Sequence, residues 1–558
     1  PIIQTSYHPN TPSSYNPNIS TTNHSLPYMP NQRIPFTQIP QFSSRDIAYA
    51  TSDPKLREFY QYEVSLASFE QVFSDKLTDP IDRELLADQL HAQYKELGIS
   101  NPPTEQIEAL SSKHGFSVIT AHQPSLFTGP LYFIYKICSC INLARQLNEA
   151  YPDRTVVPVF ITGGEDHDFE EINHLHLYGK TISWQQDQGG PVGRLPTNSL
   201  TTVLEELKDI LGDRETAQDI FGRIQQHFSE QAQYGPATVA FVHDLFSRFG
   251  LVVADMSRTG FKQAFVPNIK KEIFEQPSQP LIEAAQAALD EKGFGAQAHA
   301  REINFFYLQP GRRDRIVRNE DGTFAVNDTD LTFTADELER EIEENPERFS
   351  PNVVMRPIFQ EAIFPNLAYI GGGGELAYWL ERKSQFASFR INYPMLIRRN
   401  SVLWLDRGSQ KKLAKLGLSV QDLTEEADLI IRRFVEEQSE NELSLAEEQD
   451  QLQQLFDSIA QKAQQIDPTL SKAVKAEHAR QAKTIENLEG RLRRTEKQRF
   501  DTAMNQIRGL KDKLFPNNGL QERYDNFLGI YLQEGENMLD LLVEELDPLE
   551  PGLIVIEA

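Results

Sequence analysis

The sequence predicts an α/β core that is interrupted by insertions and followed by a long antiparallel α-helical coiled coil. Two segments, 116–161 and 352–399, show apolar strands alternating with helices, and the chain between them departs from that pattern. Segment 445–466 carries apolar residues seven positions apart, as the seam of a coiled coil requires. These observations indicate a core that the chain leaves and rejoins before it enters the coiled coil.

The first core segment reads as a strand over 116–120, a helix over about 131–147 and a second strand over 155–161. Such a unit predicts parallel strands joined by a right-handed crossover. Ligands of open parallel sheets sit beyond the carboxyl ends of the strands. The polar residues that follow both strands are therefore the first candidates for a functional site.

The middle of the chain predicts two insertions around a further strand. Residues 184–198 indicate a loop, 200–249 are helical, and 250–255 read as a buried strand that ends in a polar residue. Alternating residues over 302–330 predict a β-hairpin insertion, and Thr334 with Glu337 forms the capping box of the next helix. The core then resumes with a strand over 367–370, a turn of four glycines, a helix over 375–389 and a strand over 395–397.

The coiled coil is predicted as two long helices joined by a short turn. Leu445, Leu452, Ile459 and Ile466 define its first seam, which breaks at Asp467-Pro468. A second seam opens at 485–492 and slips its phase near 500. Because an exposed seam of this length usually finds a partner, we expect a homodimer through this arm.

Composition bounds the class of protein. The 558 residues carry a formal net charge of -26, which disfavours a nucleic-acid backbone as the main partner. No apolar run approaches the length of a membrane span. The two cysteines, Cys138 and Cys140, point away from each other on a helix, so we expect no disulfide, no cysteine-framed metal site and a cytoplasmic location. Residues 1–32, rich in Ser, Thr, Asn and Pro, are expected to be disordered or foreign to the native chain.

The densest titratable cluster, Glu165-Asp166-His167-Asp168, follows the strand over 155–161. Carboxylates and imidazoles can ligate a catalytic metal, although no His-x-x-x-His or Cys pair accompanies them. The acids can instead cap the next helix. Four polar residues exceed what one cap needs, so we favour a site where His167 and one acid bind or deprotonate a substrate amine.

Two further motifs are candidates for anion binding. His122-Gln123 ends the first strand, and Thr128-Gly129 precedes the next helix, where a phosphate could be held, although a lone His is more often only hydrogen-bonded within the fold. The glycines 371–374 permit positive φ and a close backbone approach to an anion, or form only a tight turn. Arg356 and Gln360 could clamp an anion, or Arg356 could pair with a core carboxylate.

These motifs together resemble the bacillithiol-biosynthesis cysteine ligase family from about residue 34 to the C-terminus. The resemblance is carried, in order along the chain, by residues 121–132 (AHQPSLFTGPLY), 164–174 (GEDHDFEEINH), 352–357 (NVVMRP), 369–372 (YIGG), 375–379 (ELAYW) and 514–523 (LFPNNGLQER). In this family proline is common where Gly373 stands, and the chain lacks both the complete His-x-Gly-His and the Lys-Met-Ser-Lys-Ser motifs of class I aminoacyl-tRNA synthetases.

The resemblance implies a Rossmann-like, nucleotidylyltransferase-type core with connecting insertions and a dimerising coiled coil. It implies an ATP-dependent ligase that joins cysteine to the amine of glucosaminyl-malate, with ATP and Mg²⁺ as cofactors and activation through an adenylate or an acyl phosphate. A non-catalytic dimeric scaffold that binds a sugar-malate or another anion is the alternative, and a metal-dependent hydrolase is a third.

The patterns and the resemblance together name the site residues. Asp166, His167 and Arg356 are expected to be catalytic, with no metal ligand assigned. The residues expected to bind substrate or nucleotide are His122, Gln123, Thr128, Gly129, Glu165, Asp168, Asn173, His174, Gln360, Gly371, Gly372, Gly373, Gly374, Glu375 and Tyr378. The expected domain boundaries are an N-terminal arm over 1–32, core segments over 33–180, 250–300 and 351–410, insertions over 181–249 and 301–350, a coiled-coil arm over 411–515, and a C-terminal segment packing on the core over 516–558.

Overall fold

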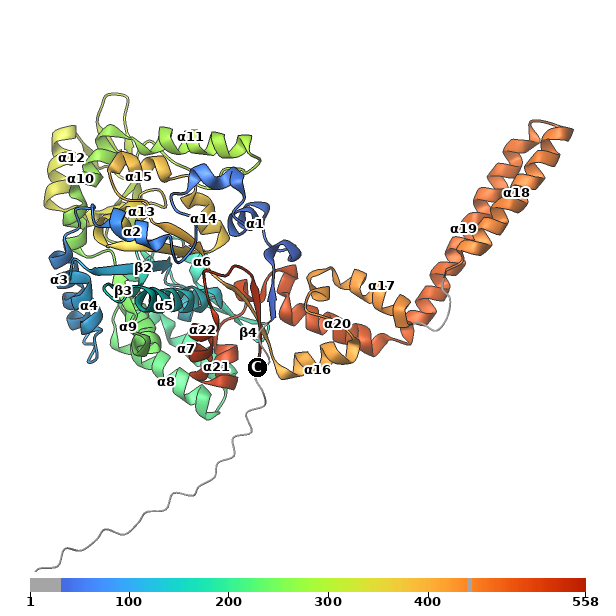
Figure 1. Cartoon of the computed structure of the whole chain (residues 1–558), viewed down its shortest axis with the longest axis horizontal. Coiled ribbons are helices and arrows are strands. Elements are labelled where there is room, and N and C mark those ends of the chain that lie inside the picture. The colour runs from blue at the N-terminus through green and yellow to red at the C-terminus, as the bar shows by residue number, and fades with distance from the viewer. Residues whose placement is uncertain (1–31, 439–443) are drawn as a thin grey trace, which may run out of the picture.

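The computed structural model describes residues 32–438 and 444–558 as a globular body from which a helical arm projects (Figure 1). The predicted N-terminal arm, except Gln32, lies outside these residues. Within the described chain, no helix combines the length and the apolar character that a membrane span requires.

The body is built on a five-stranded parallel sheet, which confirms the predicted α/β fold class. The strand order is β13-β12-β2-β3-β6. The bounds are β2 Gly115–His122, β3 Thr155–Thr162, β6 Val252–Asp255, β12 Asn366–Gly371 and β13 Met395–Arg398. His122 pairs in register with Thr162, and Thr162 with Asp255, so three strands end at one level. The polar residues after these strands therefore meet at one edge of the sheet.

The alternation of side chains along β3 divides the interior into layers. Val159 and Ile161 belong to one hydrophobic cluster, and Phe160 belongs to another on the opposite face. Helix α5, Tyr132–Ala150, packs against β2 and β3 on the face of Phe160, with an unbroken run of buried residues from Phe133 to Ala144. This confirms the predicted strand, helix, strand unit.

The insertion between β3 and β6 is richer than its sequence suggests. It begins with a short helix and a β-hairpin that were not predicted: α6 Phe169–Ile172, β4 His174–Leu177 and β5 Lys180–Ser183. Three helices follow, α7 Thr201–Leu211, α8 Glu215–Glu230 and α9 Tyr234–Phe246. Residues 184–198 contain only short 3-10 turns, as their composition predicts.

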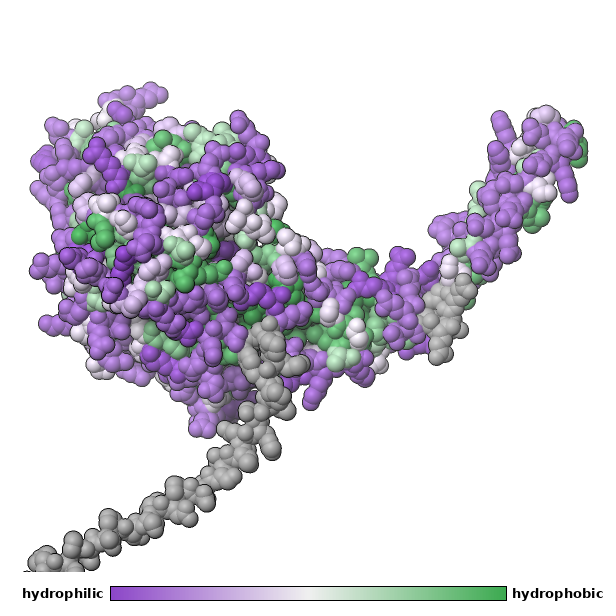
Figure 2. Space-filling view, in the orientation of Figure 1, coloured by the Kyte–Doolittle hydropathy of each residue, from purple (hydrophilic) through white to green (hydrophobic). Residues whose placement is uncertain are grey.

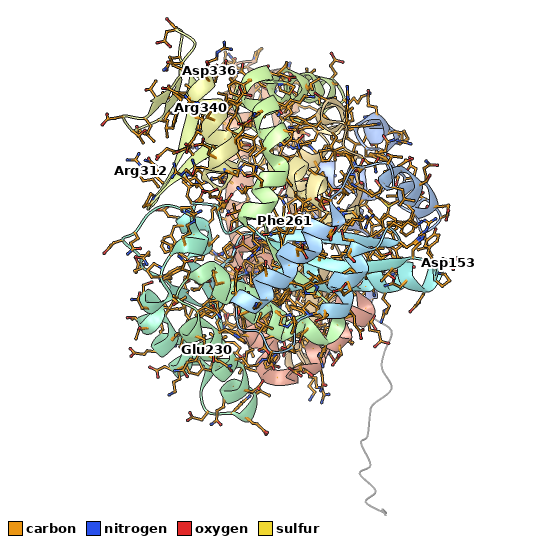
Figure 3. All side chains as sticks on the ribbon, turned by 90° about the vertical axis from the view of Figure 1, so that its left-hand side faces the viewer. Asp153, Glu230, Phe261, Arg312, Asp336 and Arg340 are labelled. Atoms are coloured by element: carbon orange, nitrogen blue, oxygen red, sulfur yellow. The ribbon has the colours of Figure 1, made fainter. Side chains whose placement is uncertain are left out.

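The second insertion forms an antiparallel sheet beside the core, after the helices α10 Thr259–Glu275 and α11 Ser278–Glu291. Its strand order is β10-β9-β8-β7-β11, which extends the predicted hairpin. The bounds are β7 Phe305–Gln309, β8 Arg312–Arg318, β9 Phe324–Val326, β10 Thr332–Phe333 and β11 Phe349–Pro351. Helix α12, Ala335–Glu344, has the predicted capping box, and Asp336 and Arg340 mark its outer side (Figure 3).

The helix predicted over 375–389 is two helices, α14 Gly373–Trp379 and α15 Lys383–Phe389. At the break, the buried Glu381 carboxylate accepts hydrogen bonds from the backbone amides of Gln297 and Ala298 at 2.6 and 3.1 Å. This contact anchors the irregular segment between α11 and β7 to the core, a tertiary demand that helix propensity does not reveal. Helix α13, Arg356–Ile363, precedes β12.

The two ends of the described chain meet in a second, small sheet. Strand β14, Ser401–Leu405, was not predicted and pairs in parallel with β15, Leu553–Glu557, which pairs with β1, Gln32–Ile34. Helix α22, Asn537–Glu545, packs on α5, and α21, Leu528–Glu534, packs on α8. The C-terminal segment is thus part of the body.

The arm confirms the predicted helical hairpin. Helices α18, Ala446–Ile466, and α19, Leu470–Gln498, pack against each other across the break at Asp467-Pro468. The phase slip near 500 coincides with the start of α20, Asp501–Leu514. Nearer the body, α17, Ala427–Gln438, packs on α20, which also contacts α16, Arg407–Leu416. Leu455, Ile466 and Leu488 on the hairpin are 56%, 80% and 47% exposed, and apolar side chains show along it in Figure 2.

We expect Asp46→Ala to destabilise the body by ~3 kcal/mol, because it leaves a buried arginine without its counter-charge. Asp46 lies on α1, Ser44–Ala50, and accepts hydrogen bonds from Arg398 at 2.6 and 3.0 Å, with 4% and 3% of the two side chains exposed. Urea unfolding measures the loss. Glu70→Ala is the control, because it breaks a 3.1 Å pair with Arg154 in which the Glu70 side chain is 67% exposed, and it should cost less than ~1 kcal/mol. Equal losses in the two variants would contradict the expected role of the buried pair.

Candidate active site at the carboxyl edge of the parallel sheet

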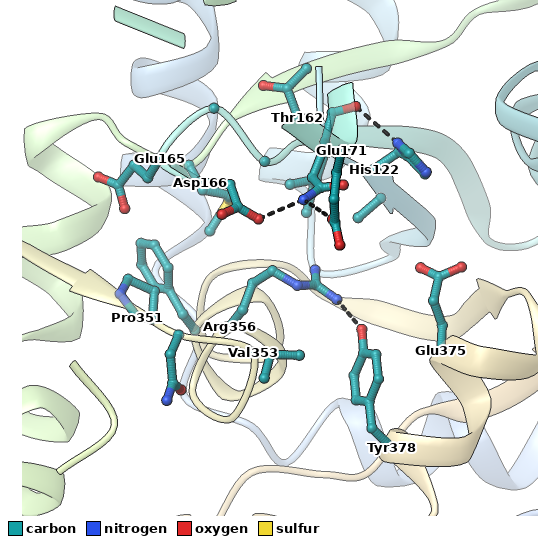
Figure 4. Close-up of a pocket in the computed structure, with 18 of the residues that line it drawn as sticks. His122, Thr162, Glu165, Asp166, Glu171, Pro351, Val353, Arg356, Glu375 and Tyr378 are labelled. Carbon is teal, nitrogen blue, oxygen red and sulfur yellow. Dashed lines mark hydrogen bonds between the residues drawn. The ribbon is translucent and has the colours of Figure 1, made fainter. Parts of the chain in front are cut away.

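A cavity of about 810 Å³ opens at the carboxyl edge of the sheet (Figure 4). Residues at or just beyond the ends of β2, β3 and β6 line it, together with α13, α14 and the antiparallel insertion. Its charged lining consists of the arginines Arg301, Arg313, Arg315, Arg356, Arg399 and Arg523 and the acids Glu165, Asp166, Glu171, Asp255 and Glu375. Six arginines face five carboxylates here, in a chain whose formal net charge is -26. The cavity therefore concentrates positive charge on an acidic protein.

Asp166 is held at the cavity by Gln123, which directly follows the last residue of the neighbouring strand β2. Gln123 Nε2 donates to Asp166 Oδ2 at 2.7 Å and to Glu171 Oε2 at 3.1 Å. The other Asp166 oxygen accepts from the amides of His167 and Asp168. Burial alone would raise the pKa of Asp166, but these hydrogen bonds and the charge of Arg313 outweigh burial and lower it. Asp166 is therefore an ionised anchor and a weak base.

Glu165 points to a buried lysine. Lys262 on α10 is fully buried and donates to Glu165 Oε2 at 2.7 Å and to the Phe349 carbonyl at 2.8 Å. The second carboxylate oxygen of Glu165 is also buried and has no hydrogen-bond partner in the described chain. This oxygen therefore keeps an unused hydrogen-bond acceptor on a residue that lines the cavity.

Asp255, the last residue of β6, lines the same cavity and was not among the predicted site residues. Burial raises its pKa, the nearby Glu165 raises it further, and hydrogen bonds from Ser257 act against this. A carboxylate with a raised pKa is a better proton acceptor than Asp166. The polar residue at the end of a strand was the signal in the sequence, since parallel strands end at the ligand edge.

His167 does not line the cavity, and its imidazole faces the insertion. Its Nδ1 accepts a hydrogen bond from Arg313 Nη1 at 2.9 Å, and its ring packs against Phe306 with centroids 5.5 Å apart. Burial and the charge of Arg313 lower the pKa of His167, so the ring is neutral. Because Nδ1 is already occupied, the position predicted to be the base is engaged in holding Arg313.

Arg313 on β8 is a site residue that no pattern in the sequence indicated. Its guanidinium stacks over Phe306 at 3.9 Å and donates to Ser350 Oγ and the Pro351 carbonyl. These contacts aim it at the cavity, where it acts on the pKa of Asp166. A strand pattern predicts which face of a sheet a side chain takes. It does not predict that Arg313, 146 residues after His167, returns to the carboxyl edge of the parallel sheet.

His122 lines the cavity as a neutral imidazole. Its Nδ1 lies 2.9 Å from the carbonyl oxygen of Gln123, and its Nε2 lies 3.1 Å from the hydroxyl of Tyr132. Burial and the charges of Lys136 and Arg399 lower the pKa of His122 to about 4. His122 therefore contributes no positive charge for a phosphate at neutral pH.

Arg356, at the start of α13, projects into the cavity, and within the described chain its hydrogen-bond partners are the uncharged Gln360, Tyr369 and Tyr378. Its guanidinium donates to Tyr378 at 3.0 Å and to Gln360 at 3.2 Å (Figure 4). Gln360 is buried outside the cavity lining, so of the predicted anion clamp only Arg356 faces the cavity. The alternative of a core ion pair does not fit either, because the hydrogen bonds that Arg356 makes within the described chain go to Gln360 and two tyrosines. Arg399 donates instead to the buried Glu522 at 2.8 and 3.0 Å, and its Nε has no hydrogen-bond partner in the described chain.

The glycine turn does not use the positive φ that its residues permit, and it forms the tight strand-to-helix turn that was the alternative. None of Gly371 to Gly374 has positive φ, because β12 leads directly into α14 with Gly372 as its N-cap in the extended region. The amide of Gly372 is occupied by Glu375 Oε2 at 2.9 Å. A side chain at Gly373 would collide with the carboxylate of Asp46. Gly373 is thus explained by packing, and only Gly372 and Gly374 reach the cavity.

Glu375 and Tyr378 lie where the prediction places them, in the cavity lining. Glu375 Oε1 accepts from Lys136 and Tyr369 at 2.8 and 2.7 Å. Burial would raise the pKa of Glu375, but these contacts lower it to about 2. The remaining predicted residues, which are Thr128, Gly129, Asp168, Asn173, His174, Gln360, Gly371 and Gly373, stand outside the lining.

The described residues support neither a reactive cysteine nor a metal-binding group of side chains. Cys138 and Cys140 are buried and free of a disulfide, and burial raises the pKa of Cys140 to about 12. In residues 32–438 and 444–558, no group of three or more His, Cys, Asp or Glu is placed to hold a metal ion.

The fold and the site define a Rossmann-like α/β protein with an arginine-lined cavity at the carboxyl edge of its sheet and a coiled-coil arm. Two family models match the chain: "Bacillithiol biosynthesis BshC, N-terminal Rossmann-like domain" over residues 29–400 and "Bacillithiol biosynthesis BshC, C-terminal coiled-coil domain" over 402–558. The chain belongs to the BshC family of bacillithiol biosynthesis.

Relatives from several organisms align with most of the chain. A Flavobacterium johnsoniae protein is 38% identical over 95% of this chain and 100% of its own length. A Cytophaga hutchinsonii protein is 34% identical over 91% of this chain and 95% of its own, and a Bacillus cytotoxicus protein is 27% identical over 89% and 95%. Each is named "Putative cysteine ligase BshC".

We expect His122 to make the protein less stable in mild acid. The unfolded chain protonates this imidazole near its ordinary pKa of 6.5, whereas the folded chain does so only near 4. Between these pH values the unfolded state therefore binds more protons than the folded state. His122 has no such effect on the free energy of unfolding above pH 6.5, and it lowers that free energy as the pH falls towards 4, by at most ~3 kcal/mol and less if solvent screens the ring. Urea unfolding of His122→Leu against pH should show a shallower acid loss than the wild type. His114→Leu, at an exposed position, is the control, and parallel curves for wild type and His122→Leu would refute the assignment.

Proposed function

We propose that this protein is an ATP-dependent cysteine ligase of bacillithiol biosynthesis, which joins the carboxylate of cysteine to the amine of glucosaminyl-malate. The observation that carries the proposal is the cavity, which six arginines and five carboxylates line. The chain as a whole is acidic, so this number of arginines around one cavity is unusual for it. A ligand set of polyphosphate, dicarboxylate and amine needs both kinds of group. Family membership and the names of the relatives support the same activity.

The arginines supply two groups of anion-binding positions. Arg313 comes from β8 of the insertion, with Arg301 and Arg315 close to it in sequence, whereas Arg356 and Arg399 come from the core. A guanidinium forms paired hydrogen bonds with phosphate or carboxylate, so either group suits the triphosphate of ATP or the malate. ATP, with Mg²⁺, supplies when bound the activation that a carboxylate needs to form an amide. Arg356 has no carboxylate partner among its hydrogen bonds and is placed to neutralise negative charge that develops on the ligand.

The acids bind and deprotonate the amine in this proposal. Asp166, kept ionised by Gln123, and the free oxygen of Glu165 accept hydrogen bonds from the substrate ammonium. An amine attacks only after it loses a proton, and Asp255 is the carboxylate at this edge whose pKa is raised. His167 then acts indirectly, by holding Arg313.

A metal-dependent hydrolase has no support from the described residues, for want of a metal-binding group. A scaffold that binds an anion without turnover remains the competing function. It shares the arginine-rich cavity, but it does not require a carboxylate suited to accept a proton. The assay below separates the two.

We propose in addition that two copies of the chain associate in the cytoplasm through the α18–α19 hairpin. Apolar side chains of its seam stand exposed on one chain, and burying them against a second copy removes them from water.

Purified protein mixed with ATP, cysteine and glucosaminyl-malate should form the thiol product, followed with the nucleotide by mass spectrometry. AMP as co-product would indicate an adenylate, and ADP an acyl phosphate. Arg356→Met should lower turnover on the order of a hundredfold, because it removes a charge that faces the ligand. Binding of the substrates by the wild type without any product would favour the scaffold.

Asp255→Asn should lower turnover on the order of a hundredfold at neutral pH if Asp255 accepts the proton, while leaving substrate affinity nearly intact. His167→Ala should lower it by roughly tenfold or less, because only the placement of Arg313 is disturbed. Comparison of kcat for the two variants under one set of conditions decides between them. A larger loss in His167→Ala would restore His167 as the base.

Leu455→Lys combined with Leu488→Lys should convert a dimer into a monomer in analytical ultracentrifugation at micromolar concentration. A lysine in the seam would be stripped of water on association, which costs more than the contact returns. Gln454→Lys, at an exposed position on the same helix, should leave the dimer intact. A monomeric wild type would rule out association through the hairpin under these conditions.

A further inference from the structure

His122 and Tyr132 form a coupled pair at the cavity. Both residues line it, His122 at the end of β2 and Tyr132 at the start of α5. Their ring centroids lie 5.3 Å apart, and His122 Nε2 lies 3.1 Å from the Tyr132 hydroxyl. His122 was expected to bind phosphate, and Tyr132 was not among the expected site residues.

The direction of each hydrogen bond in the pair follows from chemistry. The Gln123 carbonyl oxygen, 2.9 Å from His122 Nδ1, can only accept, so Nδ1 carries the proton. A neutral imidazole has one proton, and burial beside Lys136 and Arg399 keeps this ring neutral, with a pKa of about 4. Nε2 is then an acceptor, and the Tyr132 hydroxyl must donate to it.

We propose that Tyr132 is a specificity-determining residue whose hydroxyl directs its hydrogen to His122 and therefore presents only oxygen lone pairs to the cavity. This position recognises a hydrogen-bond donor of the ligand, a hydroxyl or an ammonium group, and disfavours phosphate and carboxylate. His122 is the positioning residue that fixes this polarity. The inference rests on the proposed function only in taking the cavity as the ligand site.

A positive charge lies next to the pair of His122 and Tyr132. Arg399 lies over the Tyr132 ring at 5.3 Å, so an anion is drawn to this part of the cavity by charge alone. An anion that accepted the Tyr132 hydroxyl hydrogen bond would leave the part-buried His122 Nε2 without a partner, a penalty that corresponds to about tenfold to hundredfold in affinity. The arginines thus attract anions generally, and the Tyr132 oxygen determines which atom of a ligand can settle beside it.

The test is a reversal of polarity, measured by isothermal titration calorimetry at neutral pH with two probes, inorganic phosphate and D-glucosamine. In His122→Leu the Tyr132 hydroxyl is free to donate to a ligand, so phosphate should bind about tenfold more tightly than to the wild type and glucosamine more weakly. The gain for phosphate should vanish in the double variant His122→Leu with Tyr132→Phe. Tyr132→Phe alone should bind phosphate as the wild type does and glucosamine more weakly.

A weaker or unchanged affinity for phosphate in His122→Leu would overturn the proposal, since a histidine that holds the anion itself predicts a loss. His122→Ala should show the same signs, and if neither variant folds, unchanged glucosamine binding by Tyr132→Phe would be decisive against it. Turnover is not used here, so a protein that shows the polarity reversal but no ligase activity refutes only the proposed function. An active ligase without the reversal refutes only the role of Tyr132.

Discussion

Two consecutive arginines at the end of β13 hold the ends of the described chain to the sheet. Successive side chains of an extended strand point to opposite sides, so Arg398 reaches Asp46 on α1 while Arg399 reaches Glu522 of the C-terminal segment. Both ion pairs are buried and doubly hydrogen-bonded, the condition under which a buried charge is tolerated. Only the second contact borders the cavity, where Arg399 lies against Tyr132, whereas Asp46 packs on Gly373 outside the lining. The two consecutive arginines therefore tie an N-terminal and a C-terminal segment to the sheet, and one of them also lines the site.

The charges of the cavity are arranged by partners of opposite sign from distant parts of the chain. Lys262 holds Glu165, Lys136 holds Glu375, and Glu522 holds Arg399, each pair across the join between two segments. In a medium of low dielectric a single unpaired charge would cost several kcal/mol, so each segment can dock only with its partner present. This explains how a chain with a net charge of -26 keeps six arginines around one cavity. It also implies that the insertions are structural parts of the site, since Lys262 and Arg313 both lie between β6 and β12.

The periodic features of the fold could be read from the sequence, and the tertiary ones could not. The strands around α5 and the helical hairpin were predictable because apolar spacing encodes them directly. Strand β14 was missed because its five residues gain a partner only from β15, about 150 residues later. Among site residues, Glu165, Asp166, Arg356, Glu375 and Tyr378 were found because they follow strands or belong to recognisable motifs. Arg313 and Arg399 depend on how separate segments fold over one edge, which a single sequence does not display.

The example of His122 shows that a residue's type and place in the sequence predict its position at the cavity better than they predict its chemical role. The histidine at the end of this parallel strand lines the cavity, but its protonation is set by Lys136, Arg399 and burial, none of which the strand pattern contains. Those neighbours remove its charge, and the Gln123 carbonyl fixes which nitrogen keeps the proton. The positive charge that attracts anions therefore comes from the arginines, whose charge does not depend on pH. In the proposal above, the pair of His122 and Tyr132 controls only the direction of a hydrogen bond. A site built this way can bind a strongly anionic ligand and still distinguish which of its atoms faces the strand end.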